Sequence, residues 1–142
     1  MSDKFTYKSG DFRLRPVPIA SGVAIEIGDL LKLSGGKAFK MSAAADNLKF
    51  IGVAAQRHET TSPSGSITVY LPTPNTLFEY DLDTSTTITI FDNLAFSAAQ
   101  VLTKNSTDPI ATAEESKLSA TKILCAFRLP DSSTIRYKGD AA

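Results

Sequence analysis

Residues 23–41 read VAIEIGDLLKLSGGKAFKM. The first apolar residues of this stretch occupy every second position, which is the period of a β-strand with one buried face. They are Val23, Ile25 and Ile27. Gly28 and Asp29 predict a turn, after which the alternation resumes. Ser34-Gly35-Gly36-Lys37 predicts a hairpin loop, because glycine readily adopts the positive φ angles of such loops. We therefore expect consecutive strands joined by tight turns.

The pattern continues towards the C-terminus. Residues 49–55 form a compact apolar run that predicts a strand buried on both faces. Further strands are predicted at 67–71, 77–82, 86–91 and 123–129. In the strand at 86–91 we expect Ile88 and Ile90 to face inward. Residues 42–47 are expected to form a loop or one helical turn, and residues 60–66 a surface loop.

Helix is scarce in this sequence. The one candidate is residues 112–119, where Thr112 and Glu115 have the spacing of a capping box. Its length allows one or two turns at most. The sequence therefore predicts a mainly β, single-domain protein. Residues 1–18 are expected to form an extended N-terminal arm, and residues 19–142 the β-rich domain.

Composition limits the classes of function. The chain has 142 residues and a formal net charge of zero, without the basic surplus of most nucleic-acid binders. Cys125 is its single cysteine, which excludes an intrachain disulfide. The N-terminus lacks the pattern of a secretory signal, and no apolar run approaches the length of a membrane span. We expect no nucleic-acid or membrane partner, and synthesis and folding in a cytoplasm.

Two residues have side chains that could in principle take part in a reaction, but both are expected to have no chemical role. His58 is the only histidine, and we interpret it as an exposed residue without a chemical role. Cys125 lies on the apolar face of a predicted strand, where a cysteine behaves as a small hydrophobic residue. A zinc site would need more ligands than one histidine and one cysteine. We therefore predict no catalytic residue, no metal and no cofactor.

The short motifs in the sequence also fail to indicate a catalytic or metal-binding site. Ser119-Ala120-Thr121-Lys122 matches Ser-x-x-Lys without its companion motifs, and Ser34 to Lys37 lacks the spacing of a phosphate loop. Asp81 and Asp83, with Glu79, would bind calcium at best weakly, and a solvated strand face explains them better. The sequence therefore favours binding over catalysis.

The sequence contains a weak internal similarity between two sets of segments that lie about sixty residues apart. Residues 30–31, 51–54 and 67–72 correspond to residues 94–95, 110–113 and 123–130. The identity between the two sets is low, so both a true repeat and coincidence remain open.

The stretch from Val23 to Leu82 resembles the small capsid decoration proteins of tailed phages, including the lambda-type head protein. The matching pieces, in order, are Ile27-Gly28-Asp29-Leu30-Leu31, Ser34-Gly35-Gly36-Lys37, Ile51-Gly52-Val53-Ala54 and Gly65-Ser66-Ile67-Thr68-Val69. The resemblance covers under half the chain, and the threonine-rich region after Asp83 departs from the simplest members. It implies a compact β-barrel or β-tulip-like domain, often trimeric, that binds the outer surface of an assembled capsid and stiffens it.

The N-terminal arm is expected to carry attachment. Its aromatic residues lie in a segment too short to form a core, and Pro16 and Pro18 stiffen its exit. The residues expected to contact the capsid or a neighbouring subunit are Phe5, Tyr7, Phe12 and Leu14. A frayed terminus and an arm packed on its own domain are the alternatives.

The expected partners are the major capsid protein and further copies of this chain, as a homotrimer on the virion surface. Two other functions remain open. One is a carbohydrate- or receptor-binding β-module of a phage fibre, although the chain has no tryptophan. The other is a small enzyme with a dispersed site, against which the sparse catalytic inventory argues.

Overall fold

The computed structural model describes residues 5–9, 13–73, 76–97, 100–105, 107–130, 133 and 135, with side chains from residue 13 onward. The first strands are β1 (Phe5–Ser9), β2 (Leu14–Ile19), β3 (Leu30–Ser34), β4 (Lys37–Lys40), β5 (Phe50–Ala54) and β6 (Gly65–Tyr70). The later strands are β7 (Leu77–Ile88), β8 (Asn93–Phe96), β9 (Leu102–Lys104), β10 (Ala111–Ala113) and β11 (Lys117–Phe127). One short 3-10 helix, η1 (Ala44–Lys49), precedes β5.

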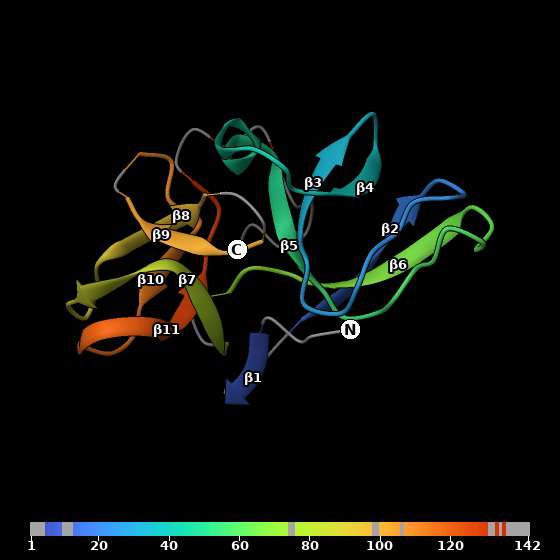
Figure 1. Ribbon diagram of the computed structural model, residues 1–142. Helices are drawn as coiled ribbons and strands as arrows, with labels where there is room; N and C mark the ends of the chain where they lie inside the picture. Colours follow the sequence, from blue (N-terminus) through green and yellow to red (C-terminus); the bar gives the residue numbers. More distant parts are fainter. Residues whose placement is uncertain are drawn as a thin grey trace.

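The strands form two sheets that lie side by side (Figure 1). One has the order β1-β7-β11-β10-β8-β9, and β7 also pairs in parallel with β9 at Leu82 and Leu102. This extra pairing closes β7, β11, β10, β8 and β9 into a barrel. The other sheet has the order β2-β6-β5-β3-β4, and its outer strands β2 and β4 approach each other without pairing in the described part of the chain. The predicted mainly β fold, with a barrel and one short helix, is confirmed.

Strands β2–β6 and strands β7–β11 follow the same plan. In each set the first strand pairs with the fifth, the fifth with the fourth, the fourth with the second and the second with the third. We call residues 14–70 the first unit and residues 77–127 the second unit. The segments that are weakly similar in sequence lie in equivalent strands of the two units, namely β3 and β8, β5 and β10, and β6 and β11. The two halves of the chain therefore repeat one strand order.

The turn that leads into β3 is held by backbone and side-chain hydrogen bonds. The N–H of Gly28 donates to the carbonyl of Ala54 at 2.9 Å, and the N–H of Asp29 donates to Glu26 at 3.0 Å. The carboxylate of Asp29 accepts the N–H of Glu26 at 2.9 Å. Gly28 has a φ of 96°, a conformation that glycine adopts without steric cost.

The turn that leads into β8 has the same bonds. The N–H of Phe91 donates to Ala113 at 2.8 Å, and the N–H of Asp92 donates to Thr89 at 2.9 Å. The carboxylate of Asp92 accepts the N–H of Thr89 at 2.8 Å. Phe91 has a φ of 75° where the first unit has Gly28. The repeat therefore extends to individual turn residues, with one change of residue type at the position of positive φ.

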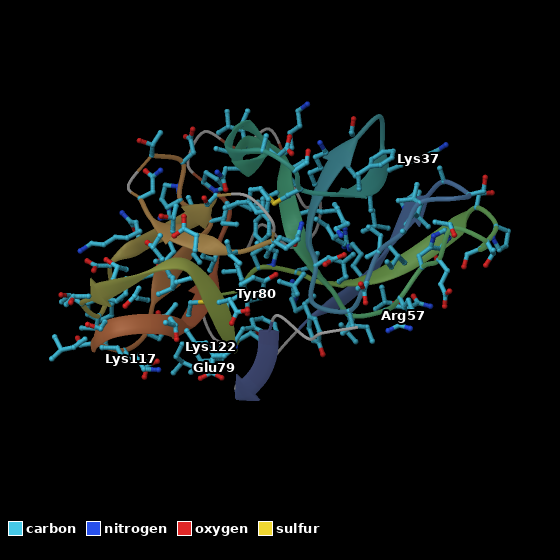
Figure 2. All side chains as sticks on the ribbon, in the orientation of Figure 1. Lys37, Arg57, Glu79, Tyr80, Lys117 and Lys122 are labelled. Carbon is cyan, nitrogen blue, oxygen red and sulfur yellow. The ribbon has the colours of Figure 1, made fainter. Side chains whose placement is uncertain are left out.

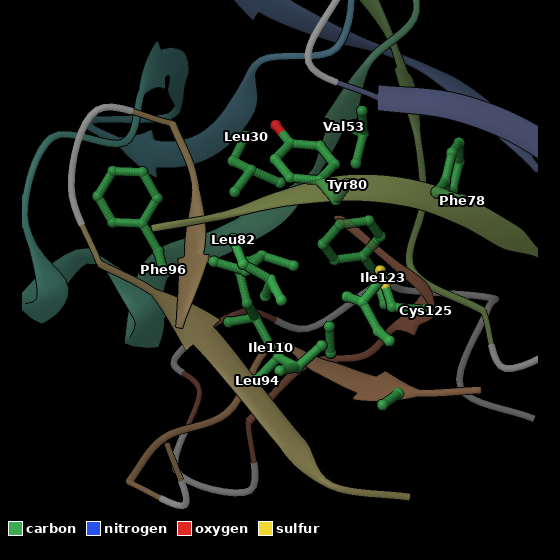
Figure 3. Close-up of a cluster of buried hydrophobic side chains, with 14 of the residues drawn as sticks. Leu30, Val53, Phe78, Tyr80, Leu82, Leu94, Phe96, Ile110, Ile123 and Cys125 are labelled. Atoms are coloured by element: carbon green, nitrogen blue, oxygen red, sulfur yellow. The ribbon is translucent and has the colours of Figure 1, made fainter. Parts of the chain in front are cut away.

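Two clusters of buried apolar side chains form the core, and β5 contributes to both. The larger cluster fills the barrel and includes Leu30 and Val53 of the first unit, which lie beside Tyr80 (Figure 3). The smaller cluster lies within the first unit and includes Ile51 and, from the C-terminal segment, Ile135. All residues of β5 are buried, which confirms the predicted strand with two buried faces.

Buried amide side chains tie the two units together. Gln100 accepts the N–H of Leu30 through Oε1 at 2.5 Å and donates through Nε2 to the carbonyl of Met41 at 2.9 Å. Asn47 of η1 makes the reverse connection. It accepts the N–H of Phe96 at 3.0 Å and donates to the carbonyl of Phe96 at 3.3 Å. A side chain of each unit thus forms hydrogen bonds with backbone N–H and C=O groups of the other unit.

The hairpin at Ser34 to Lys37 is confirmed, since β3 and β4 pair through these two residues. Gly35 and Gly36 have φ angles of 58° and 77°, which are those of a two-residue hairpin turn. The predicted strand at Val23 to Ile27 is wrong. Ile25 forms only an isolated bridge, because the turn that begins at Glu26 takes up the backbone groups that a ladder would need.

The predicted helix at 112–119 is also wrong. Thr112 lies in β10 between β8 and β11, and Lys117 begins β11. Glu115, the supposed capping residue, accepts the N–H of Leu124 across the strand at 2.9 Å instead. Pairing with two neighbouring strands overrides the weak local preference for helix. The short helix among the described residues is η1.

Residues 77–82 and 86–91 do not form two strands. They belong mainly to one strand, β7, which ends at Ile88. Ile88 is buried as predicted, but Ile90 is 40% exposed because it lies in the turn after the strand. The prediction that Ile90 faces inward is therefore wrong.

The N-terminal segment pairs with both sheets through its backbone. β1 runs antiparallel to the start of β7, with Phe5 opposite Tyr80 and Tyr7 opposite Phe78. β2 runs antiparallel to β6, with Leu14 opposite Tyr70. The segment is thus extended, and its two strands lie on different sheets (Figure 1).

Candidate binding site

The single histidine has a structural position. The side chain of His58 is 8% exposed, so the prediction that it is exposed is wrong. Its Nδ1 lies 2.6 Å from the carbonyl oxygen of Val23, and its Nε2 lies 3.0 Å from that of Pro63. The ring therefore joins the segment before β3 to the loop before β6, and both ring nitrogens are used in doing so.

The cysteine lies far from a reactive setting. Cys125 is fully buried in the barrel core. Burial raises the pKa of its thiol, and nearby Glu114 adds to this effect. The thiolate, which is the nucleophilic form, is thereby disfavoured. Cys125 and His58 lie in different units, so the structure does not bring them together.

The Ser-x-x-Lys match lies along β11. Lys122 forms an ion pair with Asp81 on the adjacent strand β7, and this hydrogen bond raises the pKa of the lysine. Figure 2 shows Lys122 beside Glu79 on the side of the barrel next to β1. Asp83 accepts the hydroxyl of Ser97 at 2.9 Å. In the described residues no three histidine, cysteine or acidic side chains are grouped so as to hold a metal ion.

The four predicted contact residues differ in what the structure describes. Phe5 and Tyr7 are placed by the backbone of β1. Phe12 lies outside the described residues. Leu14 in β2 has a side chain that is 49% exposed. A contact of these residues with a capsid or another subunit remains a prediction.

A different group of exposed apolar residues lies at the end of the barrel where β7 ends and β11 begins. The turn between β7 and β8 exposes Ile90 and Phe91, the latter to 69%, and Leu118 near the start of β11 is 82% exposed. The N–H of Ile90 donates to Ser116 at 2.9 Å, which holds this turn against the one between β10 and β11. Sequence reasoning missed Phe91, and the signal that could have found it is its alignment with Gly28.

Beside Phe91 lies an open depression of about 550 Å³. Its lining residues are Phe91, Asp92, Asn93, Lys104 and Asn105. The ammonium of Lys104 lies 3.3 Å from the carboxylate of Asp92. The hydrogen bond from the Thr89 amide, together with Lys104, lowers the pKa of Asp92, which is therefore an anion at neutral pH.

The equivalent surface of the first unit is covered. The carbonyl of Gly28 accepts the hydroxyl of Tyr80 at 2.5 Å, and Gln100 covers the backbone of Leu30 and Met41. Asp29 is buried there, although it has the counterpart of the second unit's ion pair, with Lys40 at 3.7 Å. One surface of the repeated unit is thus closed by the second unit in one copy and open in the other.

No protein-family model and no curated protein matches the sequence. Among solved structures, the fold is similar to the N base of the head fibre gp8.5 of bacteriophage phi29, with a TM-score of 0.46 and 13% identity. The match covers 88% of this chain and 100% of that one. No helix in the described residues is long and apolar enough to span a membrane.

Proposed function

We propose that this protein is a structural component of a tailed-phage virion that binds the outer surface of the assembled capsid and stabilises it. The observation that carries the proposal is the order of the four sequence pieces that resemble the decoration proteins. They follow one another in chain order within the first unit, at the turn before β3, the β3–β4 loop, β5 and the start of β6, with β4 and η1 between the second and third pieces. The resemblance thus runs through one folded unit rather than through scattered segments.

A role in binding rather than catalysis agrees with the state of the reactive side chains. Both nitrogens of His58 face backbone carbonyls, Cys125 is buried, and Lys122 is paired with Asp81. None of these side chains is available as the base or nucleophile of a reaction. We therefore propose that the protein is not an enzyme.

The proposed partners are the major capsid protein and further copies of this chain, most simply in a homotrimer. A closed ring of subunits would protect strand edges such as that of β4, which pairs only with β3 in the described residues. We further propose that the N-terminal segment contributes to attachment through Phe5, Tyr7, Phe12 and Leu14. Leu14 gains little from its own chain, since its side chain is half exposed.

Co-sedimentation with purified phage heads tests the proposal. The full chain should pellet with heads and raise the temperature at which they release DNA, whereas unassembled capsid protein should not retain it. A chain that stays in the supernatant at saturating heads would contradict the proposal.

Deletion of residues 1–12 tests the role of the N-terminal segment. This deletion spares β2 and removes β1, which pairs only with β7 in the described residues. Head binding should weaken roughly tenfold or more, while cooperative unfolding is retained. Leu14→Ala, which changes a residue of β2, should weaken binding less. Unchanged binding by the deletion variant would remove the segment from the attachment site.

A further inference from the structure

We propose that the open depression beside Phe91 is a saccharide-binding site. The ligand class is a terminal mono- or disaccharide of a glycan, held by stacking on the phenyl ring and by hydrogen bonds to the neighbouring polar side chains. This site does not depend on the proposed attachment to a capsid, since it lies at the end of the second unit, and the N-terminal segment pairs elsewhere.

Phe91 is not explained by the fold of its own chain. It has a φ of 75°, in the left-handed region where a side chain other than glycine is strained. The equivalent turn of the first unit has the same hydrogen bonds and uses glycine. The phenyl group has no polar atom that could bond locally, and it stays 69% exposed, so its burial repays little of the strain. An aromatic residue kept at such a position is suited to contact a ligand.

The polar groups around the ring supply both donors and acceptors. The carboxylate of Asp92 is an acceptor beside the ammonium of Lys104, at 3.3 Å. Oδ1 of Asn105 accepts the N–H of Thr107 at 2.7 Å, which orients the amide NH2 of Asn105 as a donor. Asn93 adds a second amide to the lining. Sugar hydroxyls both donate and accept, so this set matches their chemistry.

The ring supplies the apolar part of the recognition. The C–H bonds on one face of a pyranose carry slight positive charge and pack on the negative face of an aromatic ring. The depression is open to solvent, so the end of a glycan can reach the ring. Anionic ligands such as nucleic acid are disfavoured, because Lys104 is already paired with Asp92.

The comparison between units separates this site from a protein contact. Ile90 is 40% exposed and its counterpart Ile27 is 37% exposed, so an exposed isoleucine belongs to the turn in both units. The features present only in the second unit are Phe91, Asn93 and Asn105, where the first unit has Gly28, Leu30 and Met41. The changes combine one aromatic ring with two amides, which suits a sugar better than an apolar protein surface.

Saturation-transfer NMR on the full chain, with maltose, cellobiose and N,N′-diacetylchitobiose at millimolar concentration as probes, tests the proposal. The wild type should transfer saturation to the ring protons of at least one of these sugars. Phe91→Gly restores the residue of the first unit's turn, so it should fold normally and bind roughly tenfold more weakly or not at all. Phe91→Tyr should retain binding, and the matched control Ile27→Ala, at the exposed isoleucine of the first unit's turn, should bind sugar like the wild type.

Two results would overturn the proposal. One is the absence of saturation transfer from the wild type to all three sugars, and the other is equal transfer by Phe91→Gly. Co-sedimentation with heads is measured on the same variants. If Phe91→Gly and Leu118→Ser both abolish head binding while no sugar binds, the exposed residues Ile90, Phe91 and Leu118 form a protein contact instead. If sugar binding persists without head binding, the proposed function fails and the saccharide site stands.

Discussion

The two units share one strand order but close differently. In the second unit β7 pairs with β9 and the sheet becomes a barrel, whereas in the first unit β2 and β4 do not pair with each other in the described residues. Pro16 and Pro18 lie two residues apart in β2, so they remove N–H donors from the same edge of the strand. Their counterparts in β7 are Glu79 and Asp81, which retain theirs. The prolines therefore prevent this edge of β2 from pairing, whereas Glu79 pairs with β1 and the barrel closes further along β7, at Leu82.

The units also differ in the surface that each presents. Leu30, Val53 and Met41 of the first unit are buried against the second unit. Their counterparts in the second unit are Asn93, Thr112 and Asn105, and this surface is open to solvent. A third unit packed on this surface in the same way would therefore have to bury two amides and a hydroxyl, which is unfavourable.

The largest loss of stability is expected when Leu30 of the first unit is replaced by asparagine, the residue at the equivalent position of the second unit. Leu30→Asn places an amide in the barrel core, where Leu30 is fully buried, and should lower the free energy of unfolding by about 3–5 kcal/mol. Chemical denaturation measures the loss. The reciprocal change Asn93→Leu at the open surface should stay within about 0.5 kcal/mol of the wild type. Equal losses in both variants would show that the two surfaces are not distinguished by burial.

Gln100→Ala should have the next largest effect. It leaves the N–H of Leu30 and the carbonyl of Met41 buried without Gln100, their partner from the second unit, at a cost of about 1–3 kcal/mol. Gln56→Ala is the control, because Gln56 also accepts a backbone N–H, that of Thr68, but at an exposed position. Its loss should be about 0.5 kcal/mol. Thermal unfolding of both variants decides whether the bond between units matters more than the local one.

Phe91→Gly should change stability less than Leu30→Asn or Gln100→Ala, and in the favourable direction. Relief of the left-handed strain is partly offset by the greater freedom of glycine in the unfolded chain, so the gain should not exceed about 1 kcal/mol. Differential scanning calorimetry should show a melting temperature at or above that of the wild type. A clear drop would mean that the phenyl group stabilises the fold despite its exposure.

The repeated aspartate should titrate differently in the two units. Burial raises the pKa of Asp29, whereas the Thr89 amide and Lys104 lower that of Asp92. Asp29 binds its proton more tightly in the folded state, so its contribution to stability falls as pH rises from the unfolded pKa through the folded one. Asp92 contributes stability above its unfolded pKa and loses it as pH falls through its folded pKa.

Carboxyl 13C NMR titration measures both groups, with Asp29→Asn and Asp92→Asn to assign the signals. We expect the Asp29 midpoint to lie above the Asp92 midpoint. The reverse order would show that hydrogen bonds in the first turn outweigh its burial.

Local patterns predicted the elements whose conformation is local. The Gly35-Gly36 hairpin and the buried strand β5 follow from turn chemistry and apolar runs. The supposed helix at Thr112 failed because its residues lie between two strands that are distant in sequence. Burial of His58 depends on carbonyls brought by two separate loops. Phe91 carries no motif of its own, and its importance emerges only once its turn is superimposed on that of Gly28.

The pairing of β1 with β7 has a consequence for the order of events during synthesis. Phe5 is made before the first unit, yet its backbone partner Tyr80 belongs to the second unit. The strands β2 to β6 form a contiguous stretch and pair among themselves, so the first unit can assemble while the rest of the chain is still on the ribosome. Until β7 emerges, β1 has no strand to join, and the face around Leu30 and Val53 stays uncovered. Such long-range contacts slow folding, so this interval is when the nascent chain is most exposed to aggregation.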